Sequence, residues 1–103
     1  MRKEIMAEAL ALIDGDRAKD YGDASVNFKR IAERWSQLLG LDQIHEIRIQ
    51  PWQVAALMID LKLARLATGY KHDTAADIIG YAALMAELAE ASDDGYYRKS
   101  DDG

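Results

Sequence analysis

The segment that most constrains the fold is PWQVAALMIDLKLARLATG, residues 51–69, because its apolar residues cover most of the circumference of a helix. Pro51 suits the first turn of a helix, and Gly69 suits the position just past its end. The segment therefore predicts a helix from Pro51 to about Thr68. A helix with so few polar positions belongs at the centre of a domain or in an interface between copies of the chain. We therefore expect a homo-oligomer, with a dimer as the default.

Three further segments carry apolar residues at helical spacing. They are residues 3–13, 24–39 and 74–91. We expect Asp73 to cap the last of these helices, Asp23 or Ser25 to cap the middle one, and Gly40 to end it. Residues 41–50 alternate apolar and polar side chains only briefly, so we expect an ordered loop with a short extended piece there.

The composition agrees with an all-α fold. Half of the residues are apolar, mostly Ala, Leu and Ile, and the chain has one proline. Aliphatic β-branched and aromatic residues are few, so neither a β-sandwich nor a barrel is expected. The prediction is a small four-helix bundle-like domain over residues 1–91. Residues 92–103, SDDGYYRKSDDG, are expected to form a flexible acidic tail.

Charge and rare residue types exclude several classes of function. The net charge is −5 and the pI about 4.9, which argues against duplex DNA or RNA as a partner. There is no cysteine, and His45 and His72 are isolated, so neither disulfides nor a zinc site is expected. The longest apolar run, VAALMI at 54–59, is too short to cross a bilayer. We expect a soluble, cytoplasmic protein.

The stretch KDYGDASVNF, residues 19–28, holds more polar groups than a turn requires. Lys19, Asp20 and Tyr21 precede the helix expected from residue 24, and Asn27 and Arg30 share a face on it. Helix N-termini present free amides that attract anions. The stretch is therefore a candidate wall of an anion pocket, and the alternative is an ordered loop whose polar groups serve only the turn.

Two charged groups lie on the otherwise apolar helix expected from Pro51. Lys62 and Arg65 are three residues apart and share a face. Arg suits a bidentate grip on phosphate and Lys supplies a point charge, so the pair is a candidate anion clamp. The alternative is a surface pair whose charged ends reach water.

Asp73, Asp77 and Tyr81 follow at spacings of four and lie on one side of the last predicted helix. Acids near a helix start are favoured by its exposed amides, which is a purely structural explanation. The functional alternatives are that Asp77 holds Mg²⁺ beside a phosphate, or pairs with Lys62 or Arg65.

Three blocks of the sequence resemble a family of small, poorly characterised phage and prophage proteins. The blocks are RAKDYGDASVNFKRIAERW, VAALMIDLKLARL and KHDTAADIIGYAALMAEL, within roughly residues 16–90. The resemblance implies a phage origin and a location in the cytoplasm of the infected bacterial host, without an established activity. More distantly, the layout is similar to nucleotide-modification-associated domains and to the MazG-type all-α nucleoside triphosphate pyrophosphohydrolases. The latter likeness implies an oligomer, for which a tetramer would also suit, and a Mg²⁺ site.

The chain departs from the MazG-type pattern at the metal acids. Glu4 and Glu8 are spaced differently from the Glu-Glu-x-x-Glu motif, and Thr74 stands where a second motif has Glu. A fold that keeps a nucleotide site without these acids would bind its ligand without cleaving it.

We therefore expect a cofactor-free protein that binds a nucleotide-like phosphate ligand, with sequestration of a host nucleotide immune signal as one purpose. The expected binding residues are Lys19, Asp20, Tyr21, Asn27, Arg30, Lys62, Arg65, Asp77 and Tyr81. One alternative is a Mg²⁺-dependent nucleotide pyrophosphohydrolase in which Asp73 and Asp77 hold the metal. A second alternative is a non-catalytic interaction module whose polar clusters are structural.

Overall fold

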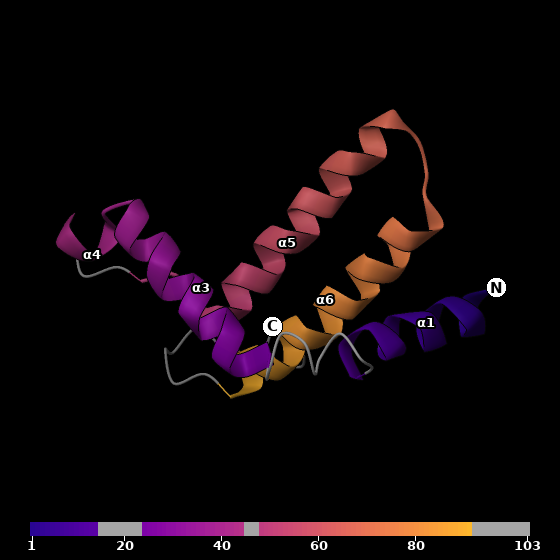
Figure 1. The fold of residues 1–103 in the computed structure, drawn as a ribbon, viewed down its shortest axis with the longest axis horizontal. Coiled ribbons are helices and arrows are strands. Elements are labelled where there is room, and N and C mark those ends of the chain that lie inside the picture. The colour runs from indigo at the N-terminus through magenta and orange to yellow at the C-terminus, as the bar shows by residue number, and fades with distance from the viewer. Residues whose placement is uncertain (15–23, 45–47, 92–103) are drawn as a thin grey trace, which may run out of the picture.

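The computed structural model describes residues 1–14, 24–44 and 48–91, and these residues form helices joined by short connections, with no strand among them (Figure 1). The elements are α1 (Arg2–Asp14), α3 (Ala24–Leu38), α4 (Leu41–Ile44), α5 (Pro51–Arg65), the 3₁₀ turn η1 (Leu66–Thr68) and α6 (His72–Glu90). The prediction of a small all-α, bundle-like domain is confirmed.

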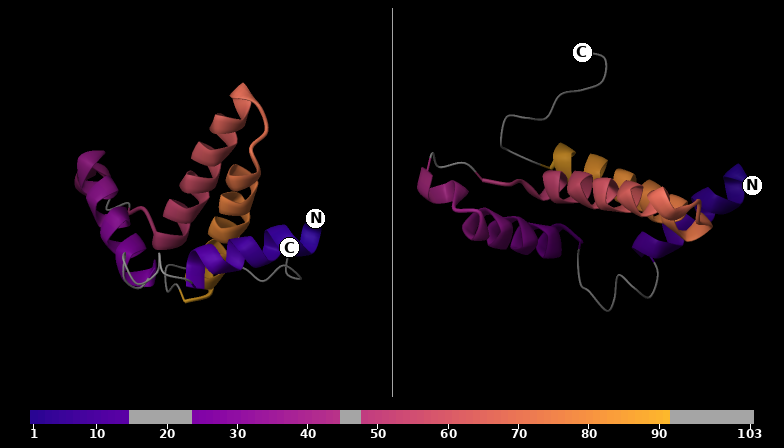
Figure 2. Two further views of the ribbon diagram at one scale, coloured as in Figure 1. Left: turned by 45° about the vertical axis from the view of Figure 1, so that its right-hand side comes forward. Right: turned by 90° about the horizontal axis from the view of Figure 1, so that it is seen from above.

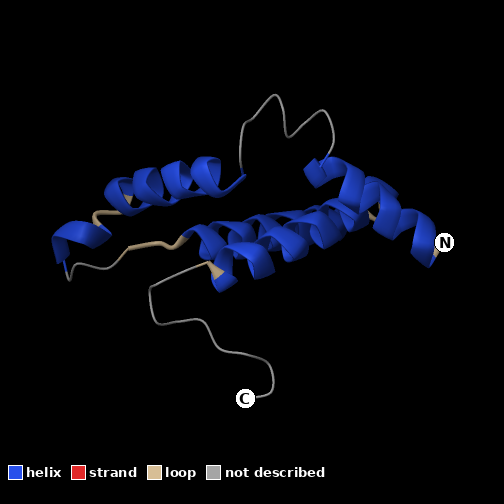
Figure 3. Cartoon of the chain, turned by 90° about the horizontal axis from the view of Figure 1, so that it is seen from below, coloured by secondary structure: helices blue, strands red, loops and turns tan. Residues whose placement is uncertain are grey.

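The helices are arranged around a central antiparallel hairpin of α5 and α6, which make the most extensive contact in the fold. α3 packs on α5 and α1 packs on α6, so the two outer helices lie at opposite ends of the molecule (Figures 2 and 3). The arrangement is open, because each outer helix covers only part of the hairpin.

The core lies where α3, α5 and α6 meet. Its buried members are Phe28, Ala32, Val54, Ala55 and Leu88. Larger, partly buried side chains surround them, including Trp35 and Trp52. This arrangement follows from the apolar stripe of α3, whose phenylalanine and alanine face the small residues near the start of α5. Small residues let the helix axes approach closely, so the core is tight but holds little apolar volume.

A serine connects α3 to the chain that enters α5. Ser36 is 1% exposed. Its hydroxyl donates to the carbonyl oxygen of Ala32 at 2.8 Å and accepts from the backbone N–H of Ile49 at 2.7 Å. The second bond satisfies a backbone donor just before Pro51, where no helix bond is available. It therefore fixes the start of α5 against α3.

α1 approaches α6 closely at a glycine. A Cβ placed on Gly80 would lie 3.5 Å from Cγ2 of Ile13 and 3.6 Å from the carbonyl oxygen of Ala9. Ala9 is 2% exposed. The small residues Ala9 and Gly80 thus lie where the two helices pack against each other.

Most predicted helix limits agree with the structure. α1 and α3 match residues 3–13 and 24–39 within a residue, and Gly40 ends α3 with φ at +69°. The helix predicted from Pro51 to Thr68 is α5 followed by η1, and Gly69 has φ at +129°. A positive φ strongly favours glycine, which explains why both residues end helices.

Two predictions about limits are wrong. Residues 41–44 form the short helix α4 rather than a loop, since the turn at Gly40 returns the chain to helical geometry and the N–H of Gln43 bonds to the carbonyl of Gly40. Asp73 is not the N-cap of α6, because the extended residue is Lys71, whose carbonyl accepts from the N–H of Ala75. Asp73 instead lies in the first turn, where the exposed amides still favour its charge.

Two other predictions fall outside the described residues. These are capping of α3 by Asp23 and the flexible tail over residues 92–103.

Candidate functional site

The centre of the candidate site is an ion pair between α5 and α6. Nζ of Lys62 lies 2.9 Å from Oδ2 of Asp77, and the two side chains are 13% and 20% exposed. The antiparallel hairpin sets this contact, because the last turns of α5 run beside the first turns of α6. Asp77 therefore pairs with Lys62, which was one of the partners expected from the sequence.

Tyr81 lies one turn beyond Asp77 on α6 and is half-buried. Its ring stacks on Phe28 of α3, with centroids 6.3 Å apart and an angle of 29° between the planes. This stacking joins the start of α3 to the face of α6 that carries Asp77. Ion pair and aromatic pair therefore lie along one face of α6.

Arg65 is exposed in the last turn of α5, three residues after Lys62 and on the same face. Its guanidinium makes no hydrogen bond or ion pair with any described residue. A cation at the C-terminal end of a helix is favoured by the helix dipole, so this position also stabilises α5.

The expected residues of α3 divide between two environments. Asn27 is half-buried and directly precedes Phe28, whereas Arg30 is exposed. Of these two residues, only Asn27 is directly next in the sequence to a member of the aromatic pair, Phe28. Lys19, Asp20 and Tyr21, together with the expected turn at Gly22, lie outside the described residues.

The acids expected to hold a metal in the enzymatic alternative are differently placed. Asp77 bonds to Lys62, while Asp73 is exposed one turn earlier on α6. Over residues 1–14, 24–44 and 48–91, no three His, Cys, Asp or Glu side chains are grouped as metal ligands. Thr74, at the position of the missing Glu, is 6% exposed.

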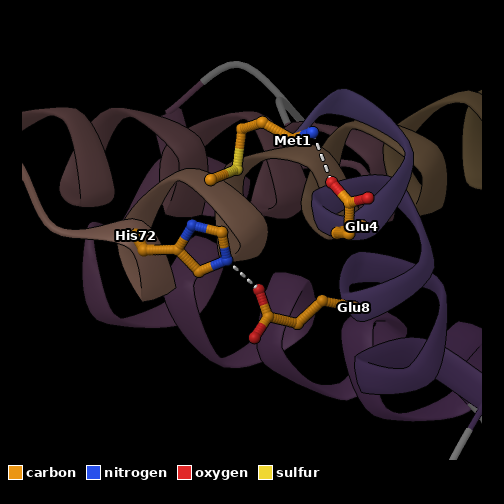
Figure 4. A network of polar contacts seen from close by, with 4 residues as sticks. All are labelled: Met1, Glu4, Glu8 and His72. Carbon is orange, nitrogen blue, oxygen red and sulfur yellow. Dashed lines mark hydrogen bonds and ion pairs between the residues drawn. The ribbon is translucent and has the colours of Figure 1, made fainter.

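Sequence reasoning missed a second polar contact, between α1 and α6. Nε2 of His72 contacts Oε2 of Glu8, while Glu4 contacts the amino group of Met1 (Figure 4). The sequence had indicated that His72 is isolated, and this contact shows that it is not. The two residues are 64 positions apart, and no spacing rule within one helix connects them. Glu8 is thus engaged by His72 of α6 and Glu4 by the amino group of Met1, and among the described residues neither forms an ion pair with Lys62 or Asp77.

A hollow between α1 and α6 adds an apolar feature near this contact. Its volume is about 300 Å³. Its lining is almost entirely apolar and includes Met6, Leu10, Ile79 and Gly80.

No helix in the described part of the chain is long and apolar enough to cross a membrane.

Two curated phage proteins are similar to the chain. The Gene 55 protein of Mycobacterium phage L5 is 39% identical over 93 residues, which cover 89% of this chain and 56% of the phage protein. The Gene 55 protein of Mycobacterium phage D29 is 39% identical over 102 residues, covering 98% of this chain and 64% of that protein. The chain thus spans less than two thirds of the length of these relatives. No solved structure matches it.

The similarity extends to a defined protein family. The profile of the family described as "Domain of unknown function (DUF6378)" matches residues 4–89, which include α3, α4 and α5 and all but the outermost residues of α1 and α6. The chain therefore belongs to the DUF6378 family.

Proposed function

We propose that this chain binds a nucleotide-like phosphate ligand beside the Lys62–Asp77 pair. The observation that carries the proposal is the partly buried ion pair with an exposed arginine one turn away on the same helix face. A well-packed apolar pair is often at least as stabilising as an ion pair at a buried position, so stability alone does not account for charges here.

The two cations have complementary roles in the proposal. Arg65 presents planar donors that suit two oxygens of one phosphate group. Lys62, oriented by Asp77, adds a fixed point charge at the other end of the same turn. Asp77 partly neutralises Lys62, so Arg65 supplies most of the attraction for the anion.

Tyr81 supplies a surface for the other half of a nucleotide. Its ring is half-buried and is held by stacking on Phe28 of the core, and an aromatic ring edge or face can contact a base. Asn27, next to Phe28, carries both a donor and acceptor for a base edge. Lys19, Asp20, Tyr21 and Arg30 complete the proposed set from the sequence alone.

The similarity to phage proteins suggests a biological purpose for nucleotide binding by this chain. A phage protein that holds a nucleotide without cleaving it lowers its free concentration, and we propose a host nucleotide immune signal as the ligand. The phage origin of the two relatives supports this purpose.

The test combines thermal shift with nucleotide turnover, using linear and cyclic nucleotides with and without Mg²⁺. We expect one class of nucleotide to raise the Tm without product formation, because a ligand that binds only the folded state stabilises it. Arg65→Ala should weaken binding by at least about tenfold, a loss of about 1.4 kcal/mol. Arg34→Ala, which removes an exposed arginine of α3 outside the proposed set, is the matched control.

The other outcomes distinguish the alternatives. Mg²⁺-dependent product that is abolished by Asp77→Asn would establish the pyrophosphohydrolase instead. No shift and no product across the panel, with Arg65→Ala and Arg34→Ala behaving alike, would leave the pair as a structural contact of an interaction module.

A further inference from the structure

An apolar stripe runs along the outer side of α5. It consists of Leu57, Leu61 and Ala64, and we call it the α5 stripe. Leu57 and Leu61 are 46% and 47% exposed, and Ala64 is exposed as well. The spacing of four and then three residues places the three on one line along the helix. This is the spacing by which one helix packs against another.

The position of the stripe is unusual for a surface. α5 is the central helix of the fold, and over the span of the stripe its charged residues are Asp60 and Lys62, of which Lys62 is paired with Asp77 of α6. The exposed apolar residues of α1, Met6 and Leu10, have Glu8 between them, and Arg2, Lys3 and Glu4 precede them on the same helix. Charges keep a helix face hydrated, so a line of apolar residues such as the α5 stripe is suited to burial.

The chain itself offers little to cover the stripe. In residues 15–23, 45–47 and 92–103, which lie outside the described ranges, Ile47 is the only aliphatic residue larger than alanine. The described core is also small, and Val54 is its largest fully buried hydrophobic side chain. A small domain with so modest a core commonly gains stability by association.

We propose that the α5 stripe is the contact between two copies of this chain, with the two α5 helices antiparallel about a two-fold axis. An axis that passes between residues 60 and 61 places Leu57 opposite the partner's Ala64, and the same contact repeats by symmetry. A large side chain then meets a small one at both ends, which makes the stripe complementary to itself. Such self-complementarity is the requirement of a two-fold interface.

The dimensions of the helix suit such an interface. α5 has 15 residues and is therefore about 22 Å long. The pairing of α5 and α6 in both copies would form a four-helix layer with its leucines inside.

Sedimentation equilibrium on the full chain tests the proposal. We expect the native chain to have twice the mass of one copy, which is 11.5 kDa. Leu61→Glu should raise the dissociation constant at least about tenfold, because it places a carboxylate in the apolar contact. Leu10→Glu is the matched control, since Leu10 is similarly exposed, at 56%, but lies on α1. This control should remain a dimer.

A native chain that stays monomeric at high concentration would overturn the proposal. So would dissociation by Leu10→Glu but not by Leu61→Glu, because the contact would then lie on α1. Circular dichroism of both variants shows whether their helices are intact.

Cross-linking provides a second readout that does not require a disruptive substitution. The chain has no cysteine, so a single introduced thiol can react only with another copy. A short bis-maleimide should join Leu61→Cys into covalent dimers in higher yield than Leu10→Cys. Equal yields, or a higher yield for Leu10→Cys, would contradict an α5 contact. Because neither readout involves a nucleotide, the result is independent of the proposed binding function.

Discussion

Ser36 and the Lys62–Asp77 pair are polar side chains through which separate elements of the chain contact one another. Each satisfies a group that would otherwise be partly buried without a partner. The Ser36 hydroxyl accepts a hydrogen bond from the N–H of Ile49, and the Asp77 carboxylate forms an ion pair with the Lys62 ammonium group. Loss of one member leaves the other with an uncompensated desolvation cost.

Replacement of Ser36 by alanine is expected to lower the free energy of unfolding by about 1–3 kcal/mol, because the N–H of Ile49 loses its acceptor. Gln37→Ala, at the next and exposed position of α3, should change the stability by no more than about 0.5 kcal/mol. Urea unfolding followed by circular dichroism measures both. Equal effects would show that the Ser36 bond does not hold the segment before α5.

The Lys62–Asp77 pair is expected to behave as a coupled unit. Asp77→Ala alone should cost about 1–3 kcal/mol, less than the roughly 3–5 kcal/mol for breaking a fully buried pair, because both side chains keep some exposure. The double variant Lys62→Met with Asp77→Ala should cost less than the sum of the single changes. A double-mutant cycle by urea unfolding checks this, and simple additivity would mean that the two charges do not interact.

The contacts between helices depend on where glycine is placed. Gly80 lies inside α6 at its contact with α1, and Gly69 allows the chain to leave η1. Only Gly69 uses a backbone angle that favours glycine, because a Cβ at Gly80 would lie at ordinary contact distance from α1. Gly69 has φ at +129°, a region that residues with a Cβ rarely enter.

Alanine at these two positions should have opposite effects. Gly80→Ala places its Cβ at ordinary contact distance from Ile13 and Ala9, so the gain in helix propensity should stabilise by up to about 1 kcal/mol. Gly69→Ala should destabilise by about 1–3 kcal/mol, since the backbone angle there is strained for alanine. Thermal and urea unfolding of both variants measures the signs. A destabilised Gly80→Ala would mean that the contact between α1 and α6 does not accommodate a Cβ at this position.

At the scale of the whole molecule, the distribution of apolar residues is uneven. The core where α3, α5 and α6 meet is tight, yet leucines of the central helix remain exposed. A single copy therefore leaves apolar surface uncovered that a second copy would bury. Stability should consequently depend on assembly as well as on the fold of one chain.

The Tm of the native chain is expected to rise with protein concentration, because association favours the folded state by mass action. The Tm of Leu61→Glu should be nearly independent of concentration. Differential scanning calorimetry over a dilution series measures both. If the native chain dissociates over the concentration range of the dilution series and its Tm still does not change, dimer formation does not stabilise the fold.

The sequence by itself determined the helices and their ends. Helical spacing of apolar residues, Pro51 at a helix start, and glycines at 40 and 69 are local signals, because each acts within one or two turns of chain. They predicted an all-α fold and most limits correctly. The local errors arose where weak signals competed, as at Asp73, where an acid suits both the cap and the first turn.

Only the tertiary structure decided which side chains meet. The sequence left several possible partners for Asp77, and the structure pairs it with Lys62. The contact between Glu8 and His72 was not predicted. Such contacts depend on the relative positions of helices, which follow from the packing of small residues such as Ala9 and Gly80. Helical periodicity specifies which residues share a face of one helix, whereas packing between helices selects the face that each one contacts.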